Sequence, residues 1–156
     1  MNRWYTGNGE EVGFSNILAE IGEHTADQGV VYIGTDSFLT SDCCTFATAI
    51  VLHGATGQRG GTYFFTKNRT EKHRYDVLVV RVTEEVNLSV QMAMAIKMAN
   101  PAACIEVHLD ISSSNKKAGT SKFSDMLVKY VKGAGFRTKI KPDAFAAASV
   151  ADKHSK

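Results

Sequence analysis

Apolar residues in this chain follow two different spacings, and the spacing changes along the sequence. β-forming runs cover 30–38 ("VVYIGTDSF"), 44–54, 60–68, 104–112 and 136–142. Helical spacing instead marks 14–25, 76–99 and 122–135, and a last segment, 143–156, closes the chain. Asp76 can cap the long helix, and Asn100-Pro101 ends it. The predicted order is therefore helix, three strands, helix, strand, helix, strand, helix.

This order predicts an α/β fold with a five-stranded mixed sheet. The first three strands would form an antiparallel meander, and right-handed crossovers would add the parallel strands. Helices on both faces would bury the sheet. The 156 residues fit a single domain, 1–156, in which residues 1–28 form an N-terminal helical extension.

Composition narrows the class of protein. Apolar residues make up 44% of the chain and charged residues 22%, as in ordinary globular proteins. The opening "MNRWYTGNGEEVGF" lacks the apolar core of a signal peptide, and no apolar run reaches membrane-spanning length. Three cysteines without a Cys-x-x-Cys pair indicate neither a disulfide framework nor a zinc site. We therefore expect a cytoplasmic protein with no membrane partner.

The small net charge of +2 hides an uneven distribution. From Lys116 onward ten basic and three acidic residues give +7, while the preceding part has eight basic and thirteen acidic residues and carries −5. A basic end next to an acidic body is typical of a surface that faces a polyanion, although solvated lysines explain it equally well. Arg137, Lys139 and Lys141 share one face of the last strand, either as such a surface or as the charged guard of a sheet edge.

Four acidic residues occupy positions where a core-facing pattern would place apolar ones. They are Asp36 late in the first strand, Glu85 in the stripe of the long helix, Asp110 at the end of "IEVHLD", and Asp152 near the C-terminus. Taken singly, each has an ordinary explanation: turns favour aspartate, and Ser149 with Asp152 fits a helix capping box. Glu84 is the alternative to Glu85, because helix phase drifts over a long segment.

Convergence makes these acids a candidate site. Parallel neighbouring strands would bring Asp36 and Asp110 to the same end of the sheet, where open α/β sheets bind ligands. Like charges about 4 Å apart repel by roughly 4 kcal/mol at an effective dielectric near 20, so protons or cations must compensate. All-oxygen ligands suit Mg²⁺ or Mn²⁺, and two such ions are a common device for attack on a phosphodiester.

The strand order and the acid order together resemble the ribonuclease H fold. "YIGTDSF" resembles the Thr-Asp-Gly-Ser signature on the first strand of that fold. More closely, "IGTDS", "EEVNLSV", "HLDIS" and "PDAFAAASVADKHSK" resemble the YkuK family of RNase H-like proteins, over 30–156. The resemblance implies metal-dependent phosphodiester hydrolysis with two Mg or Mn ions. Asp36 would bridge both ions, Glu85 and Asp110 would share one, and Asp152 would hold the ion that activates water.

Other polar residues are candidates for substrate binding or support. Ser37 and Ser112 follow the two strand aspartates and could orient a carboxylate or touch a phosphate. The candidates for gripping a nucleic-acid backbone after Asp110 are Lys116, Lys117 and Lys122. The candidates for a supporting role near the acids are His108, Asp143 and His154, each with an ordinary structural alternative: a core histidine, a turn and a solvated end.

The sequence leaves two functions open. One is a nuclease acting on DNA, RNA or a hybrid, with metal-bound acids. The other is a non-catalytic module that retains the RNase H-like fold and binds nucleic acid or protein. Ribonucleases H usually carry a histidine in the loop before the last aspartate, and none lies between Phe136 and Asp152. The resemblance therefore does not extend to hybrid specificity.

Overall fold

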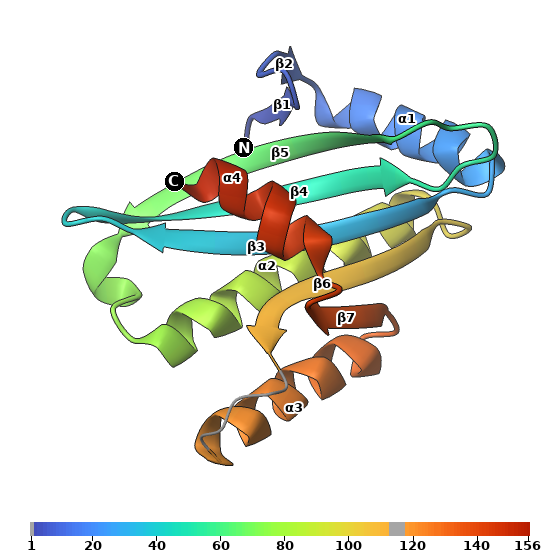
Figure 1. The fold of residues 1–156 in the computed structure, drawn as a ribbon. Helices are drawn as coiled ribbons and strands as arrows, with labels where there is room; N and C mark the ends of the chain where they lie inside the picture. The colour runs from blue at the N-terminus through green and yellow to red at the C-terminus, as the bar shows by residue number, and fades with distance from the viewer. Residues whose placement is uncertain (1, 113–117) are drawn as a thin grey trace.

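A computed structural model describes residues 2–112 and 118–156 of the chain (Figure 1). Its strands are β1 (Trp4–Thr6), β2 (Glu11–Val12), β3 (Val30–Leu39), β4 (Cys43–His53), β5 (Gly61–Glu71), β6 (Cys104–Ser112) and β7 (Arg137–Lys141). Its helices are α1 (Phe14–Ala26), a 3₁₀ turn (Lys72–Arg74), α2 (Leu78–Ala99), α3 (Ala118–Gly133), and α4 (Asp152–Ser155), which continues a π-helical segment (Ala146–Ala151).

The described strands form one seven-stranded sheet in the order β2-β1-β5-β4-β3-β6-β7. The strands β3, β4 and β5 are antiparallel, whereas β6 and β7 run parallel to β3. The predicted α/β class and mixed sheet are confirmed, and the predicted count of five strands is wrong.

The two additional strands come from the segment expected to be an N-terminal helical extension, 1–28, of which only Phe14–Ala26 is α-helical. Strands of three and two residues are too short to show a period of two. They are held instead by tertiary contacts: Trp4 pairs with Thr66 in β5, and its side chain is buried in the core.

Helices cover the two faces of the sheet unequally. On one face, α1, α2 and α3 bury the main core, in which Ile17, Val90 and Val131 pack against Val31 and Ile33 of β3. On the other face, the C-terminal helix lies across the strands (Figure 1), and Ala146 and Ala151 pack on Ala49 and Val51 of β4. Small residues at these positions allow the helix backbone to approach the sheet closely.

The long helix begins slightly later than its sequence indicates. Asp76 was expected as the cap, but Val77 is the last extended residue before α2, and no side-chain hydrogen bond caps the helix. The end at Asn100 is as predicted. None of the helices in the described ranges is long and apolar enough to span a bilayer.

Candidate functional site

Asp36 and Asp110 lie together where strands β3 and β6 stop pairing. The parallel ladder between the two strands ends at Gly34 opposite His108, and each aspartate comes two residues later. The carboxyl group of Asp110 is close enough to contribute to the raised pKa of Asp36. Because neighbouring parallel strands end at the same edge of a sheet, two residues far apart in the sequence become neighbours here.

Glu85 reaches the same place from α2, which lies on the face of β3 that carries Thr35 and Ser37. The hydroxyl of Ser37 donates a 2.7 Å hydrogen bond to Glu85 Oε1. One turn further along the helix, Ser89 Oγ lies 2.7 Å from Thr35 Oγ1, and this buried contact fixes α2 against β3. Glu85 is buried, whereas Glu84 is half-buried. The helix register therefore turns Glu85 toward the two aspartates.

Burial and neighbouring negative charges raise the pKa values of Asp36 and Glu85. Burial raises the pKa of Asp36 to about 8, and the charge of Glu85 adds to this increase. Burial also raises the pKa of Glu85 to about 7, although the hydrogen bond from Ser37 opposes the shift. The charge of Asp110 raises both pKa values. Close to neutral pH Asp36 therefore favours the protonated form, and Glu85 is about half protonated.

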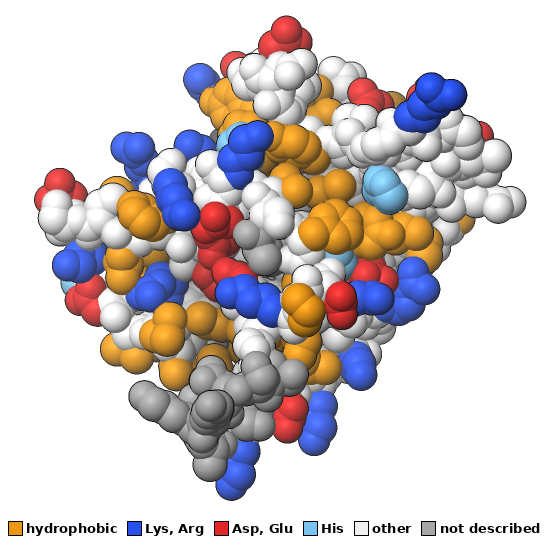
Figure 2. Space-filling view, viewed as in Figure 1, with side chains coloured by type: hydrophobic (Ala, Val, Ile, Leu, Met, Phe, Trp, Pro, Cys, Tyr) orange, Lys and Arg blue, Asp and Glu red, His pale blue; other side chains and the backbone are white. Residues whose placement is uncertain are grey.

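Lys141 supplies positive charge at the edge of this cluster. Its Nζ lies 2.8 Å from Asp110 Oδ1, and the hydrogen bond to Asp110 raises the pKa of the lysine. Figure 2 shows acidic side chains near the middle of this face of the molecule, directly beside a basic side chain. The sequence pattern predicts Lys141 either in a basic stripe or as a charged guard of the sheet edge, and not beside an acid. Parallel pairing of β6 with β7 places the end of β7 opposite Ser112 and so near Asp110, which the strand pattern alone does not reveal.

The fourth predicted acid, Asp152, occupies a different environment. It lies at the start of α4, its side chain is 40% exposed, and Oδ2 is 3.4 Å from Lys156 Nζ. The residue of α4 that touches the buried acids is Ser155, whose hydroxyl lies 3.0 Å from Asp36 Oδ2 and 3.1 Å from the carbonyl oxygen of Asp152. Asp152 thus lies one helical turn from the cluster, and Ser155 was missed because serine near a chain end carries no distinctive signal.

The cluster has the donor chemistry of a site for a hard cation, but its side chains are not arranged as a metal site. In the described ranges, no group of three or more His, Cys, Asp or Glu side chains is positioned to hold a metal ion. Hydrogen bonds from Ser37 and Ser155 and the ammonium of Lys141 occupy carboxylate oxygens instead. All the acidic ligands are oxygen donors, which suit Mg²⁺ or Mn²⁺.

The residues predicted to bind substrate lie in different surroundings. Ser37 contacts Glu85, so it orients a carboxylate. Ser112 ends β6 opposite Lys141. Lys122 is exposed on α3, while Lys116 and Lys117 lie outside the described residues.

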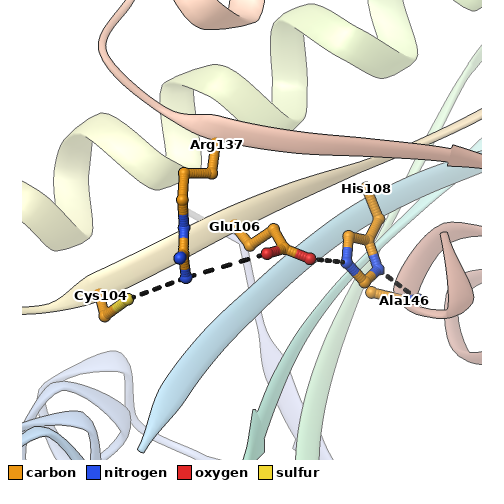
Figure 3. A network of polar contacts seen from close by, with 5 residues as sticks. All are labelled: Cys104, Glu106, His108, Arg137 and Ala146. Atoms are coloured by element: carbon orange, nitrogen blue, oxygen red, sulfur yellow. Dashed lines mark hydrogen bonds and ion pairs between the residues drawn. The ribbon is translucent and has the colours of Figure 1, made fainter. Parts of the chain in front are cut away.

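His108 belongs to a network of polar contacts that also includes Glu106, Arg137, Cys104 and Ala146 (Figure 3). One ring nitrogen, Nε2, lies 2.9 Å from Glu106 Oε1, and the other, Nδ1, accepts a hydrogen bond from the backbone N–H of Ala146. Arg137 lies 3.9 Å from the second oxygen of Glu106 and donates to the sulfur of Cys104. Burial lowers the pKa of His108. This geometry is that of a core histidine joining β6 to the C-terminal helix.

The two remaining supporting candidates also have structural contacts. Asp143 is exposed in the turn after β7, where its N–H bonds to the carbonyl of Ile140. The ring of His154 stacks on Phe65, with centroids 3.6 Å apart, and Nε2 lies 3.0 Å from the hydroxyl of Tyr63. His154 therefore anchors α4 on β5.

Comparison with known proteins agrees with this fold. A family model described as "Ribonuclease H-like" matches residues 13–156. Searches of curated proteins and of solved structures returned no match. The predicted resemblance to the YkuK group is confirmed, because this family model is the one for that group. The chain belongs to the ribonuclease H-like family.

Proposed function

We propose that this protein is a metal-dependent nuclease that hydrolyses a phosphodiester bond of a nucleic acid. The observation that supports this best is the convergence of Asp36, Glu85 and Asp110 at the end of the β3–β6 ladder, in a chain of the ribonuclease H-like family. Burying three carboxyl groups close together destabilises the folded state, and such arrangements are typical of sites that bind a charged ligand.

The donor set fits Mg²⁺ or Mn²⁺. Asp36, Glu85 and Asp110 would hold the ions, and Asp152 would join them from α4. The raised pKa values of Asp36 and Glu85 express the shortage of positive charge that a cation would relieve. When bound, two such ions would supply an activated water and stabilise the charge that develops on the phosphate oxygens.

The chain's own residues would prepare this reaction. Ser37 holds the Glu85 carboxylate by its Oε1, and Ser155 holds Asp36 by its Oδ2, so both acids are oriented before any ligand arrives. Lys141 keeps Asp110 paired in the absence of a cation. If Asp110 bound a cation instead, the ammonium of Lys141 would be free to contact a substrate phosphate. Asp152 would have to leave Lys156, a half-exposed pair that costs little to break.

The decisive experiment compares wild type with Asp36→Asn on single-stranded and duplex DNA, RNA and hybrid substrates with Mn²⁺ or Mg²⁺. Cleavage by wild type should be lost in Asp36→Asn, while circular dichroism shows an intact fold. Asp143→Asn, which removes an exposed acid from a turn, is the matched control and should retain activity. Cleavage by Asp36→Asn at the wild-type rate, or no cleavage by wild type on any substrate, would refute the proposal.

A non-catalytic nucleic-acid-binding module is the second candidate. It is favoured by the 2.8 Å ion pair between Lys141 and Asp110, which gives this carboxylate a permanent partner without a metal. Titration calorimetry with Mn²⁺ separates the two functions. A nuclease should bind Mn²⁺ in a manner that depends on Asp36, whereas a binding module should show salt-dependent nucleic-acid binding without turnover.

A further inference from the structure

A basic hollow lies beside the carboxylate cluster, on the sheet face that carries Asp36. Its volume is about 380 Å³, and its walls come from the β3–β4 turn, from β5 and from the end of α4. The basic and aromatic residues that line it are Phe38, Lys67, Arg69 and Lys156. Ser155 also lines it, and the hydroxyl of this serine contacts Asp36. We call this hollow the strand groove.

Sheet register aligns the strand groove with the candidate site. Asp36 pairs with Ala47 of β4, and Ala47 pairs with Lys67 of β5, so all three lie in one row across the sheet. Strands are about 4.8 Å apart, which puts the Lys67 backbone roughly 10 Å from that of Asp36. Side chains alternate with a period of two, so the next row on this face contains Phe38 and Arg69.

The groove carries positive charge that the protein leaves uncompensated. Lys67 and Arg69 are exposed, and neither forms an ion pair within the described part of the chain. Lys156 pairs with Asp152, and Asp42 is the acidic residue of the groove wall. The positive charges of Lys67 and Arg69 would attract a polyanion into the strand groove, which lies beside the acidic cluster.

The exposed ring of Phe38 indicates that the ligand also contains a group that can stack on it. Phe38 is 39% exposed and lies among the polar residues Thr40, Thr45, Lys67 and Arg69 of the groove. Nucleic-acid-binding grooves without sequence preference combine cations along the backbone with aromatic rings on which bases stack. A base can stack on such a ring only when it is not already stacked within a duplex.

We propose that the strand groove binds a single-stranded segment of nucleic acid and leads it to the carboxylate cluster. Two phosphates lie against Lys67 and Arg69, and an unpaired base stacks on Phe38. The choice of nucleic acid as ligand rests on the proposed function, while the preference for a single strand comes from the groove itself.

The test measures the affinity of a fluorescent pyrimidine oligonucleotide, and of the matching duplex, for the full chain in EDTA at several salt concentrations. Each phosphate contact to a single strand contributes about 0.7 to the slope of log affinity against log salt concentration. The double variant Lys67→Ala/Arg69→Ala should therefore lose about 1.4 of that slope. The matched control, Lys129→Ala/Lys132→Ala, removes two exposed lysines from α3 and should leave the slope unchanged.

Phe38→Ala tests base stacking separately from electrostatic attraction. Loss of one stacked base should weaken binding of the single strand about 10-fold and leave the salt slope unchanged. An equal effect on duplex and single strand, or an unchanged slope in the double lysine–arginine variant, would overturn the assignment of the groove.

The outcomes separate this inference from the nuclease proposal. If the groove variants behave as expected but wild type cleaves nothing with Mn²⁺, the groove stands and the nuclease proposal fails. If wild type cleaves while the groove variants bind and cleave normally, the groove is wrong and the nuclease proposal stands. Failure of wild type to bind any oligonucleotide in EDTA overturns the groove, while the cleavage assay with Mn²⁺ decides the nuclease proposal. Thermal melting of each variant shows whether it is folded.

Discussion

Lys141 Nζ lies 2.8 Å from Asp110 Oδ1, so the last strand of the sheet supplies a cation to the acidic end of its parallel neighbour. A divalent ion bound there would compete with this ammonium for the same oxygen. The lysine thus stabilises the cluster of carboxyl groups and would oppose metal binding there.

We expect Lys141→Met to bind Mn²⁺ several-fold more tightly than wild type and to melt at a lower temperature without metal at pH 8. Titration calorimetry and thermal melting measure the two effects. Lys139→Met, two residues earlier on the same strand and also exposed, is the control and should change neither. Weaker Mn²⁺ binding in Lys141→Met would mean that the lysine assists the ion rather than competes with it.

Stability without metal should fall as the pH rises from 6.5 to 8.5. The pKa of Asp36 is raised to about 8 and that of Glu85 to about 7, so in this window the folded state holds protons that the unfolded chain has released. The free energy of unfolding should decrease by about 1–3 kcal/mol, measured by urea denaturation. The lowered pKa values of His108 and His154 act in the opposite direction, mostly below about pH 7, and therefore offset part of the decrease only at the lower end of this window.

Two conditions should suppress this pH dependence. Asp36→Asn removes the carboxyl group with the larger shift, and saturating Mn²⁺ replaces its proton with a cation. A free energy of unfolding that increases with pH over this window would contradict the assignment.

Glu85 and its neighbour Glu84 form a matched pair for mutation. Glu85→Gln should reduce metal-dependent cleavage by at least about 100-fold, since it removes a charge from the cluster. Glu84→Gln should stay within about twofold of wild type, because that side chain is only half-buried and the hydrogen bond from Ser37 goes to Glu85. Single-turnover rates at saturating Mn²⁺ measure the difference. Equal losses in both variants would show that helix stability, not the carboxylate, is affected.

His108 should matter for stability rather than for chemistry. His108→Ala leaves the buried Glu106 carboxylate and the N–H of Ala146 without their partner, at a cost of about 2–4 kcal/mol in the free energy of unfolding. His53→Ala, at an exposed histidine in β4, should cost less than about 0.5 kcal/mol. If folded His108→Ala lost cleavage at a temperature far below its midpoint, the ring would have a direct role in the site.

Long, regular elements were predictable from local patterns. The apolar run at 30–38 and the stripe along 76–99 correspond to β3 and α2, since a strand or helix of this length repeats its spacing often enough to be recognised. The N-terminal strands at Trp4 and Glu11 could not be found in this way. The strand at Trp4 pairs with β5, which is distant in the sequence, the strand at Glu11 pairs with β1, and neither is long enough to show alternation.

The candidate site shows the same division. The sequence by itself determined the order of the acids along the chain and the α/β class of the fold, because chain order and hydrophobic period are local properties. The tertiary structure alone decided that Asp36, Glu85 and Asp110 meet, that Lys141 and Ser155 join them, and that Asp152 lies one turn away beside Lys156. Side-chain encounters between separate elements depend on strand pairing, on where the β3–β6 ladder ends and on the π-helical turn before α4, and none of these is encoded in a local period.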